Sequence, residues 1–142
     1  MTEIIIFSLV ILAFVVMAFW EAYAEGEHGG AAQTLGPKIK ILGFQFKLYH
    51  LLLFGVFLPL LLSLPLVATG FNFRLFRFIV ASYFLGIVVE DFLWFCINPK
   101  WPLKNFNSKY VTWYPWLKIG KLEIPLFYIP CIVIAGLLLF IF

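Results

Sequence analysis

Residues 4–24 read IIIFSLVILAFVVMAFWEAYA, an apolar run that meets no charged residue before Glu21. About 20 such residues in a helix are enough to cross the roughly 30 Å hydrocarbon core of a bilayer. Three further apolar stretches follow and predict spans at residues 48–69, 78–98 and 124–142. The sequence therefore predicts an all-α membrane protein, a bundle of four transmembrane helices that forms a single domain over residues 1–142.

The composition excludes a soluble domain. The 142 residues are 64% hydrophobic and 20% aromatic, and only 12% are charged, whereas about a quarter of a soluble chain is charged. The two cysteines, Cys96 and Cys131, lie in apolar segments without a C-x-x-C spacing. We expect them to be small buried hydrophobic residues, not a disulfide framework or a metal-binding knuckle.

Two long polar connections link the predicted spans, and each contains a stretch in which apolar and polar residues alternate around a glycine. These stretches are residues 38–46 and 117–124. A period of two with a glycine turn predicts a short β-hairpin in each connection. Since a lone hairpin is marginally stable, we expect the two to pair into one small sheet over the end of the bundle.

Pro59 and Pro65 fall inside the second predicted span. Proline removes a helical hydrogen bond, so both are expected to bend this helix. Neighbouring helices, hydroxyl groups or water would then take up the carbonyls that the prolines leave free.

The basic residues predict the orientation of the chain. Eight lysines lie in the two long connections and only two arginines lie in the short link of residues 70–77. The lysines are Lys38, Lys40, Lys47, Lys100, Lys104, Lys109, Lys118 and Lys121, and the arginines are Arg74 and Arg77. The positive-inside rule therefore places both long connections in the cytoplasm and both termini outside.

The two halves of the chain show the same order of features. Each begins with a descending span that carries a glutamate near its lower end, Glu21 in one half and Glu90 in the other. A parallel repeat of two helices each would place these glutamates together, and His50 near Tyr128. The alternative is coincidence, because membrane sequences use few residue types.

Five ionisable residues in the predicted spans fall at one level, near the cytoplasmic side. They are Glu21, Glu25, His50, Glu90 and Asp91. A charged side chain at the centre of a transmembrane helix costs roughly 2.5–3.5 kcal/mol, so such residues face the bundle interior and indicate function. Asp91 points about 100° away from Glu90 around the helix, so the two cannot serve one ligand equally.

Three interpretations of this group remain open. In the leading one, Glu21, His50 and Glu90 bind zinc, iron or manganese, with Glu25 or Asp91 completing the shell, and the protein acts on a membrane-soluble substrate. The spacing of Glu25 and His28 fits a metal-binding helix, although only once. In the second, the same groups carry protons or cations through a homo-oligomer.

The third interpretation is structural. Lys47 would neutralise Glu90 or Glu21, Asp91 would cap loop amides, and the chain would be a non-catalytic accessory protein of a larger membrane complex. Membrane lipids are the expected partners of the basic connections. Nucleic acid is not expected, because the glycines of residues 26–36 do not follow a phosphate-loop pattern.

The chain contains the segment Glu90-Asp91-Phe92-Leu93-Trp94-Phe95, followed by Asn98-Pro99, with Trp20-Glu21 and Glu25-Gly26 upstream. With these residues it resembles a group of small multi-pass proteins. Over most of its length the chain resembles these membrane proteins of prokaryotes. The resemblance implies a location in the prokaryotic plasma membrane. It implies no activity, cofactor or ligand.

Overall fold

The chain is mostly helical in the computed structural model, which describes residues 2–27, 36–42 and 44–140. Three of its helical segments are long and apolar enough to cross a membrane: α1 (Thr2–Glu25), the continuous segment Leu48–Thr69, and α4 (Phe73–Ile97). A fourth apolar helix, α5 (Tyr128–Phe140), is shorter. The three long segments agree in length and apolar composition with three of the four expected spans.

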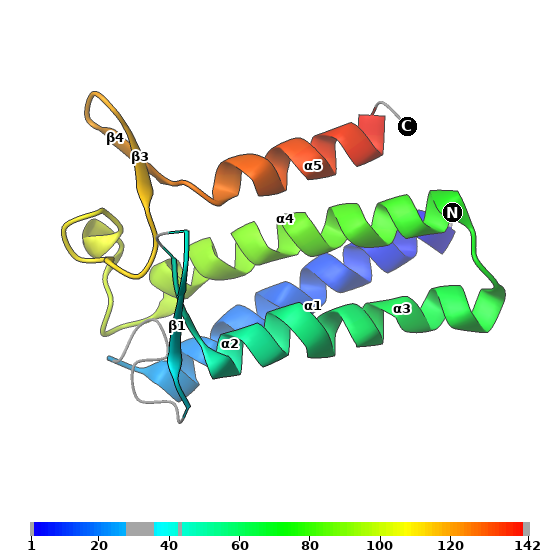
Figure 1. Ribbon diagram of the computed structural model, residues 1–142, viewed down its shortest axis with the longest axis horizontal. Helices are drawn as coiled ribbons and strands as arrows, with labels where there is room; N and C mark the ends of the chain where they lie inside the picture. The colour runs from blue at the N-terminus through cyan, green and yellow to red at the C-terminus, as the bar shows by residue number, and fades with distance from the viewer. Residues whose placement is uncertain (1, 28–35, 43, 141–142) are drawn as a thin grey trace.

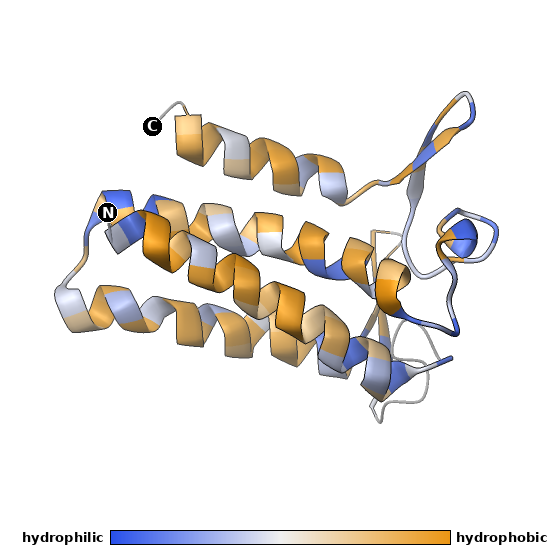
Figure 2. Ribbon diagram, turned by 180° about the vertical axis from the view of Figure 1, so that it is seen from behind, coloured by the Kyte–Doolittle hydropathy of each residue, from blue (hydrophilic) through white to orange (hydrophobic). Residues whose placement is uncertain are grey.

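The helices lie side by side, with the described ends of the chain together at one end and the two hairpins at the other (Figure 1). α1 and α4 both run from the chain ends toward the hairpins, whereas the segment Leu48–Thr69 and α5 run back. Apolar residues cover the helices along their length, and hydrophilic residues gather near the helix ends (Figure 2).

The packing of α1 against α4 forms the centre of the molecule. Phe14 of α1 is 2% exposed, and its ring lies over Gly86 of α4, where a methyl group would overlap it. Near the start of both helices, Arg74 Nε lies 3.5 Å from the carboxylate of Glu3. α1 and α4 are therefore held together from their first turns, which fixes how their far ends meet.

The second span is one continuous run of three helical pieces: α2 (Leu48–Leu52), the π-helical turn η1 (Leu53–Phe57) and α3 (Leu58–Thr69). In the π register the amide of residue 59 would donate to the carbonyl of Phe54, but Pro59 has no amide hydrogen. The Tyr83 hydroxyl of α4 donates to that carbonyl instead. The structure thus places an irregular turn and a neighbouring hydroxyl where the sequence predicts a proline bend.

Both predicted hairpins are present. Strands β1 (Lys38–Ile41) and β2 (Phe44–Lys47) pair antiparallel, and so do β3 (Trp116–Ile119) and β4 (Leu122–Pro125). The expectation that they form one sheet is wrong, because each remains a sheet of two strands. The edge of β2 is instead hydrogen-bonded to the third connection, the chain of residues 98–115 between α4 and β3. There the backbone N–H of Gln45 donates to the Trp113 carbonyl at 2.9 Å.

The second hairpin is fastened to the loop before it. Glu123 Oε2 accepts the backbone N–H of Ser108 at 2.6 Å, and Lys118 Nζ lies 3.6 Å from the other oxygen. The hydrogen bond from the Ser108 backbone, with the nearby lysine, lowers the pKa of Glu123 from its ordinary value. Glu123 is therefore a surface carboxylate with a structural role outside the helices.

Two helix limits differ from the expected spans. α4 begins at Phe73 and not at residue 78, because the Asn72 side chain accepts the amide of Leu75 at 3.0 Å and starts the helix there. α5 begins at Tyr128 and not at residue 124, because residues 122–125 belong to β4. Its 13 residues rise about 20 Å, less than the hydrocarbon thickness of roughly 30 Å.

Candidate functional site

A cavity of about 420 Å³ lies toward the hairpin end of the helices. Its lining includes all five ionisable residues expected from the sequence: Glu21, Glu25, His50, Glu90 and Asp91. The remaining lining residues are mostly apolar or aromatic and come from α2, η1, α4, α5, β2, the third connection and Phe127, which directly precedes α5. The cavity therefore joins one polar end to a long apolar wall.

Hydrogen bonds between the ends of α1 and α4 fix the position of the acidic residues of one helix along its axis relative to those of the other. Asn98, which is 2% exposed, donates from Nδ2 to the Gly26 carbonyl at 2.7 Å. Trp101 Nε1 donates to the Glu27 carbonyl at 2.9 Å. Because Pro99 ends α4 immediately after Asn98, these bonds join the two helix ends, and the glutamates one or two turns above them face each other.

Glu21, Glu25 and His50 form the tightest group of the cavity. One ligand atom from each lies within 4.8 Å of the other two. His50 Nε2 is 3.4 Å from Glu25 Oε1, and the Tyr49 hydroxyl donates to Glu21 Oε1 at 3.1 Å. The spacing of four between Glu21 and Glu25 places both on one face of α1, and β2 leads directly into α2 and delivers Tyr49 and His50 opposite them.

Glu90 joins this group from α4. Its side chain is 5% exposed, and its carboxyl group lies within hydrogen-bonding reach of the carboxyl group of Glu21. Two carboxyl groups this close hold a proton between them or share a cation, since two adjacent charges repel. Three carboxyl groups and an imidazole from three helices thus meet at one place.

Asp91 lines the same cavity but faces a different set of partners. The hydroxyls of Tyr128 and Tyr114 donate to its Oδ2 atom at 2.6 and 3.2 Å. Burial, together with the charge of Asp91, raises the pKa of Tyr114, so this hydroxyl remains a donor. The predicted angle of about 100° between Asp91 and Glu90 accounts for this division, and tyrosine hydroxyls, not loop amides, are what Asp91 binds.

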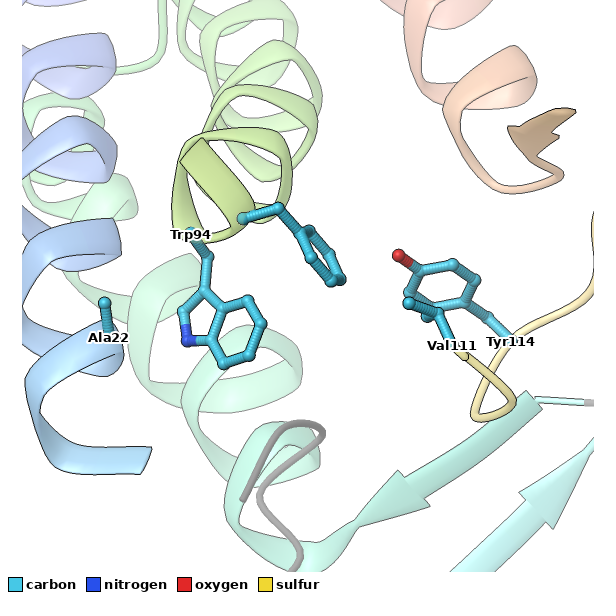
Figure 3. Packing of buried hydrophobic residues seen from close by; sticks show 5 residues of the cluster. Ala22, Trp94, Val111 and Tyr114 are labelled. Carbon is cyan, nitrogen blue, oxygen red and sulfur yellow. The ribbon is translucent and has the colours of Figure 1, made fainter. Parts of the chain in front are cut away.

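Two buried polar atoms beside the cavity make no hydrogen bond among the described residues: Glu25 Oε1, whose contact is the ion pair with His50 Nε2 at 3.4 Å, and Trp94 Nε1. Trp94 packs between Ala22 of α1 and the aromatic residues of the third connection, and the hydroxyl of Tyr114 points toward α4 (Figure 3). A buried polar group without a hydrogen bond costs about 1–3 kcal/mol, so these two atoms are the least satisfied polar side-chain atoms among the described residues.

The group of Glu21, Glu25 and His50 has the chemistry of a divalent-cation site. Two ligands of a tetrahedral zinc, each about 2.0–2.2 Å from the metal, stand about 3.4 Å apart. His50 Nε2 and Glu25 Oε1 have this separation. Carboxylate and imidazole donors together suit zinc, iron or manganese.

Four further residues of the candidate site were not among the site residues expected from the sequence, although the predicted repeat placed the last of them near His50: Tyr49, Trp94, Tyr114 and Tyr128. Each belongs to an aromatic-rich segment, where the ordinary expectation is an interfacial ring. The position of Tyr49 directly before His50 was the one local feature of the sequence that could have indicated a place in the site. Lys47, expected to neutralise a glutamate, is buried, and His28 lies outside the described residues.

The function of the cavity is therefore inferred from its geometry and from its donor and acceptor atoms. Comparison of the chain with known protein families, curated proteins and solved structures finds no match.

Proposed function

We propose that this protein is a four-span membrane protein that binds a divalent cation, zinc, iron or manganese, between Glu21, Glu25, His50 and Glu90. The observation that carries the proposal is the convergence of three ligand atoms within 4.8 Å of one another, with a fourth carboxyl group adjacent. Asp91 stands apart because two tyrosine hydroxyls already hold it.

Charge balance supports a cation at this place. The cluster holds three carboxyl groups, and Glu21 and Glu90 are 4% and 5% exposed. Ionised carboxylates inside a membrane protein require a compensating charge. A divalent cation would neutralise two of them and would also bind Glu25 Oε1, which makes no hydrogen bond among the described residues.

Orientation follows from the distribution of lysine and arginine. Both hairpins lie at the end of the molecule that carries the lysine-rich connections, opposite the chain ends (Figure 1). The excess of eight lysines over two arginines supports a cytoplasmic location for the hairpins, and the cation site would then lie just beneath the cytoplasmic face. α5 would be the fourth crossing of the bundle.

The competing function is structural, and two contacts favour it. His50 pairs with Glu25 at 3.4 Å, and the Tyr49 hydroxyl binds Glu21. In that case the polar residues would satisfy one another, and the protein would be an accessory subunit without a bound ion. The two functions predict different metal contents for the same purified protein.

Elemental analysis of the protein after equilibration with zinc, iron or manganese and removal of free metal distinguishes them. We expect about one equivalent of metal in the wild type, and its loss in His50→Ala and Glu21→Gln, since each removes a ligand. Glu90→Gln should lower the metal content in the same way, because Glu90 is the fourth proposed ligand. Affinity should also fall on acidification, because the ligands bind metal only when deprotonated.

Glu123→Gln is the matched control, because this carboxylate lies in β4, outside the cavity. It should retain the full metal content. A wild-type protein that stays free of all three metals at neutral pH, with folding confirmed by its helical circular dichroism, would overturn the cation site in favour of the structural function.

A further inference from the structure

The cavity has an aromatic wall that the proposed divalent-cation site does not use. Four of its lining rings follow one another in contact, with centroids 5.1–6.4 Å apart: Phe44, Phe127, Tyr114 and Trp113. Neighbouring rings in this series make angles of 67–79°, so they meet as adjacent walls of a box do and not as a stack. The face of an aromatic ring attracts cations, and several rings around one space are typical of sites that bind organic ammonium ions.

Asp91 places a carboxyl group directly beside this aromatic wall. The hydroxyls of Tyr114 and Tyr128 both donate to Oδ2, and the Tyr114 hydroxyl points toward α4 (Figure 3). Oδ1 makes no hydrogen bond among the described residues, yet it is not one of their enclosed polar atoms, so this oxygen keeps accessible surface. Because Asp91 lines the cavity, Oδ1 is the oxygen that a ligand there can reach.

An apolar strip leads from Asp91 toward the middle of the helices. Tyr83, Ile87 and Asp91 are spaced four residues apart on α4, so they lie along one face of the helix, and all three line the cavity. Phe54 of η1 lies beside the far end of this strip, since the Tyr83 hydroxyl donates to its carbonyl. A carboxyl group, an aromatic wall and an apolar strip thus lie next to one another in one cavity.

We propose that the cavity binds an organic ammonium ion with one apolar body, such as an amine that carries an aryl or alkyl chain. The ammonium group pairs with Asp91 Oδ1 and lies against the rings of Tyr114 and Phe127. The apolar body lies along Ile87 and Phe54. This ligand goes beyond the divalent-cation site, because none of the four proposed metal ligands holds its ammonium group.

Charge and size both favour this class of ligand. The described lining of the cavity contains four carboxyl groups and neither lysine nor arginine, so a positive group is attracted and a phosphate or carboxylate is repelled. The volume of about 420 Å³ falls in the range of about 300–1,000 Å³ that is usual for small-molecule sites. A metal ion with a few water molecules of about 30 Å³ each would fill only part of it.

Isothermal titration calorimetry with phenylbutylamine tests the proposal on the full-length protein in an uncharged detergent at neutral pH, after a chelator has removed divalent metal. Phenylbutanol and phenylbutanoate have the same apolar body with a neutral and a negative head. We expect saturable binding of the amine, and an affinity at least tenfold lower for the alcohol and for the carboxylate. Equal affinity for the alcohol would show a general apolar contact and would overturn the proposal.

Two variants test the two contacts of the ammonium group. Asp91→Asn keeps the shape of the side chain and removes its charge, and it should lower the affinity for the amine by about tenfold or more. Phe127→Leu keeps an apolar side chain and removes the aromatic face, which should lower the affinity by about two- to thirtyfold. Unchanged affinity in both variants would place the amine elsewhere and would overturn the proposal.

Glu123→Gln and Phe92→Leu are the matched controls, because they make the same kinds of change outside the lining of the cavity. Phe92 is 41% exposed on α4, directly after Asp91 in the sequence. Both variants should bind the amine as the wild type does. A loss of affinity in Phe92→Leu equal to that in Phe127→Leu would count against the aromatic wall as the binding surface.

His50→Ala separates this proposal from the divalent-cation site. This variant should lose its metal and still bind the amine, since it removes no group that contacts the ammonium ion. Failure of the metal site is therefore seen in the metal content, and failure of the amine site is seen by calorimetry. If His50→Ala abolished amine binding while Asp91→Asn left it unchanged, the amine would be occupying the metal ligands, and the proposal would be wrong.

Discussion

Gly86 is the position where the packing of α1 on α4 leaves least room. Replacing glycine with alanine inside a helix ordinarily stabilises it by about 0.5–1 kcal/mol. At Gly86 the added methyl group would overlap the buried ring of Phe14, which itself lies against the rings of Phe54 and Tyr83. We therefore expect Gly86→Ala to destabilise the protein by about 1–3 kcal/mol, measured as a lower midpoint of unfolding in detergent.

Gly136→Ala provides the comparison for that experiment. A Cβ atom at Gly136 meets nothing within 4 Å, so this variant should be as stable as the wild type or slightly more stable. Equal stability of the two variants would show that α1 and α4 do not pack at Gly86 as described.

At the same scale, the sequence identified the acidic residues of the cavity but not their hydrogen-bond partners. Glu21 and Glu90 were predictable because a carboxyl group inside a membrane is costly wherever it points. Tyr114 and Tyr128 were not, because an aromatic residue near the interface is common and its hydroxyl can meet water, lipid or protein. Which tyrosine reaches Asp91 depends on how α5 and the third connection fold back, and no local pattern encodes that.

Among the elements, the π turn in the second span depends on a contact with another helix. Pro59 leaves the Phe54 carbonyl without an amide donor, and the Tyr83 hydroxyl supplies one. Tyr83→Phe should therefore destabilise the protein by about 1–3 kcal/mol, the cost of a buried carbonyl without a partner.

A double-mutant cycle tests this cause. In a Pro59→Ala background the new amide can donate to the Phe54 carbonyl, so the effect of Tyr83→Phe should largely disappear. The measurement is the difference in unfolding midpoint among the four proteins. Additive effects of the two substitutions would mean that Tyr83 stabilises the fold in another way.

Element limits were harder to predict than element types. The alternating stretches correctly indicated both hairpins, because a period of two is a local property of the chain. The start of α5 was wrong because residues 124 and 125 are as compatible with a strand as with a helix, and pairing with β3 decides between them. Around the last turns of α4, the ring of Phe95 packs against the rings of Phe106 and Trp113.

For the whole molecule, both halves place an aromatic hydroxyl on an acidic residue of the preceding descending helix. Tyr49 donates to Glu21 in the first half, and Tyr128 donates to Asp91 in the second. The expected meeting of Glu21 and Glu90 agrees with a parallel repeat, whereas His50 contacts Glu25 and Tyr128 contacts Asp91. The repeat itself stays a prediction, but it would account for the two similar pairs beside the cavity, Tyr49 with Glu21 and Tyr128 with Asp91.

The crossing of the membrane by α5 is the remaining question at this scale, since its 13 residues are short for a span. Two contacts fix its height beside α4: Tyr128 binds Asp91 at one end, and Arg77 Nε donates to the Leu138 carbonyl at 2.8 Å at the other. Tyr128 and Leu138 are ten residues apart, a rise of about 15 Å, whereas Asp91 and Arg77 are fourteen residues apart on α4, a rise of about 21 Å. The long side chains of Tyr128 and Arg77 make up the difference, so α5 runs alongside α4 toward the end at which α4 begins.

We accordingly expect single cysteines at the two ends of the molecule to react with a membrane-impermeant maleimide from opposite sides of sealed vesicles. In a background with Cys96 and Cys131 replaced by alanine, Lys40→Cys and Lys121→Cys of the hairpins should react from the cytoplasmic side. Phe71→Cys and Phe140→Cys, which replace residues that are 73% and 87% exposed, should react from the other side. If Phe140→Cys reacted only from the hairpin side, α5 would not cross, and the contact between Arg77 and the Leu138 carbonyl would not form in the membrane.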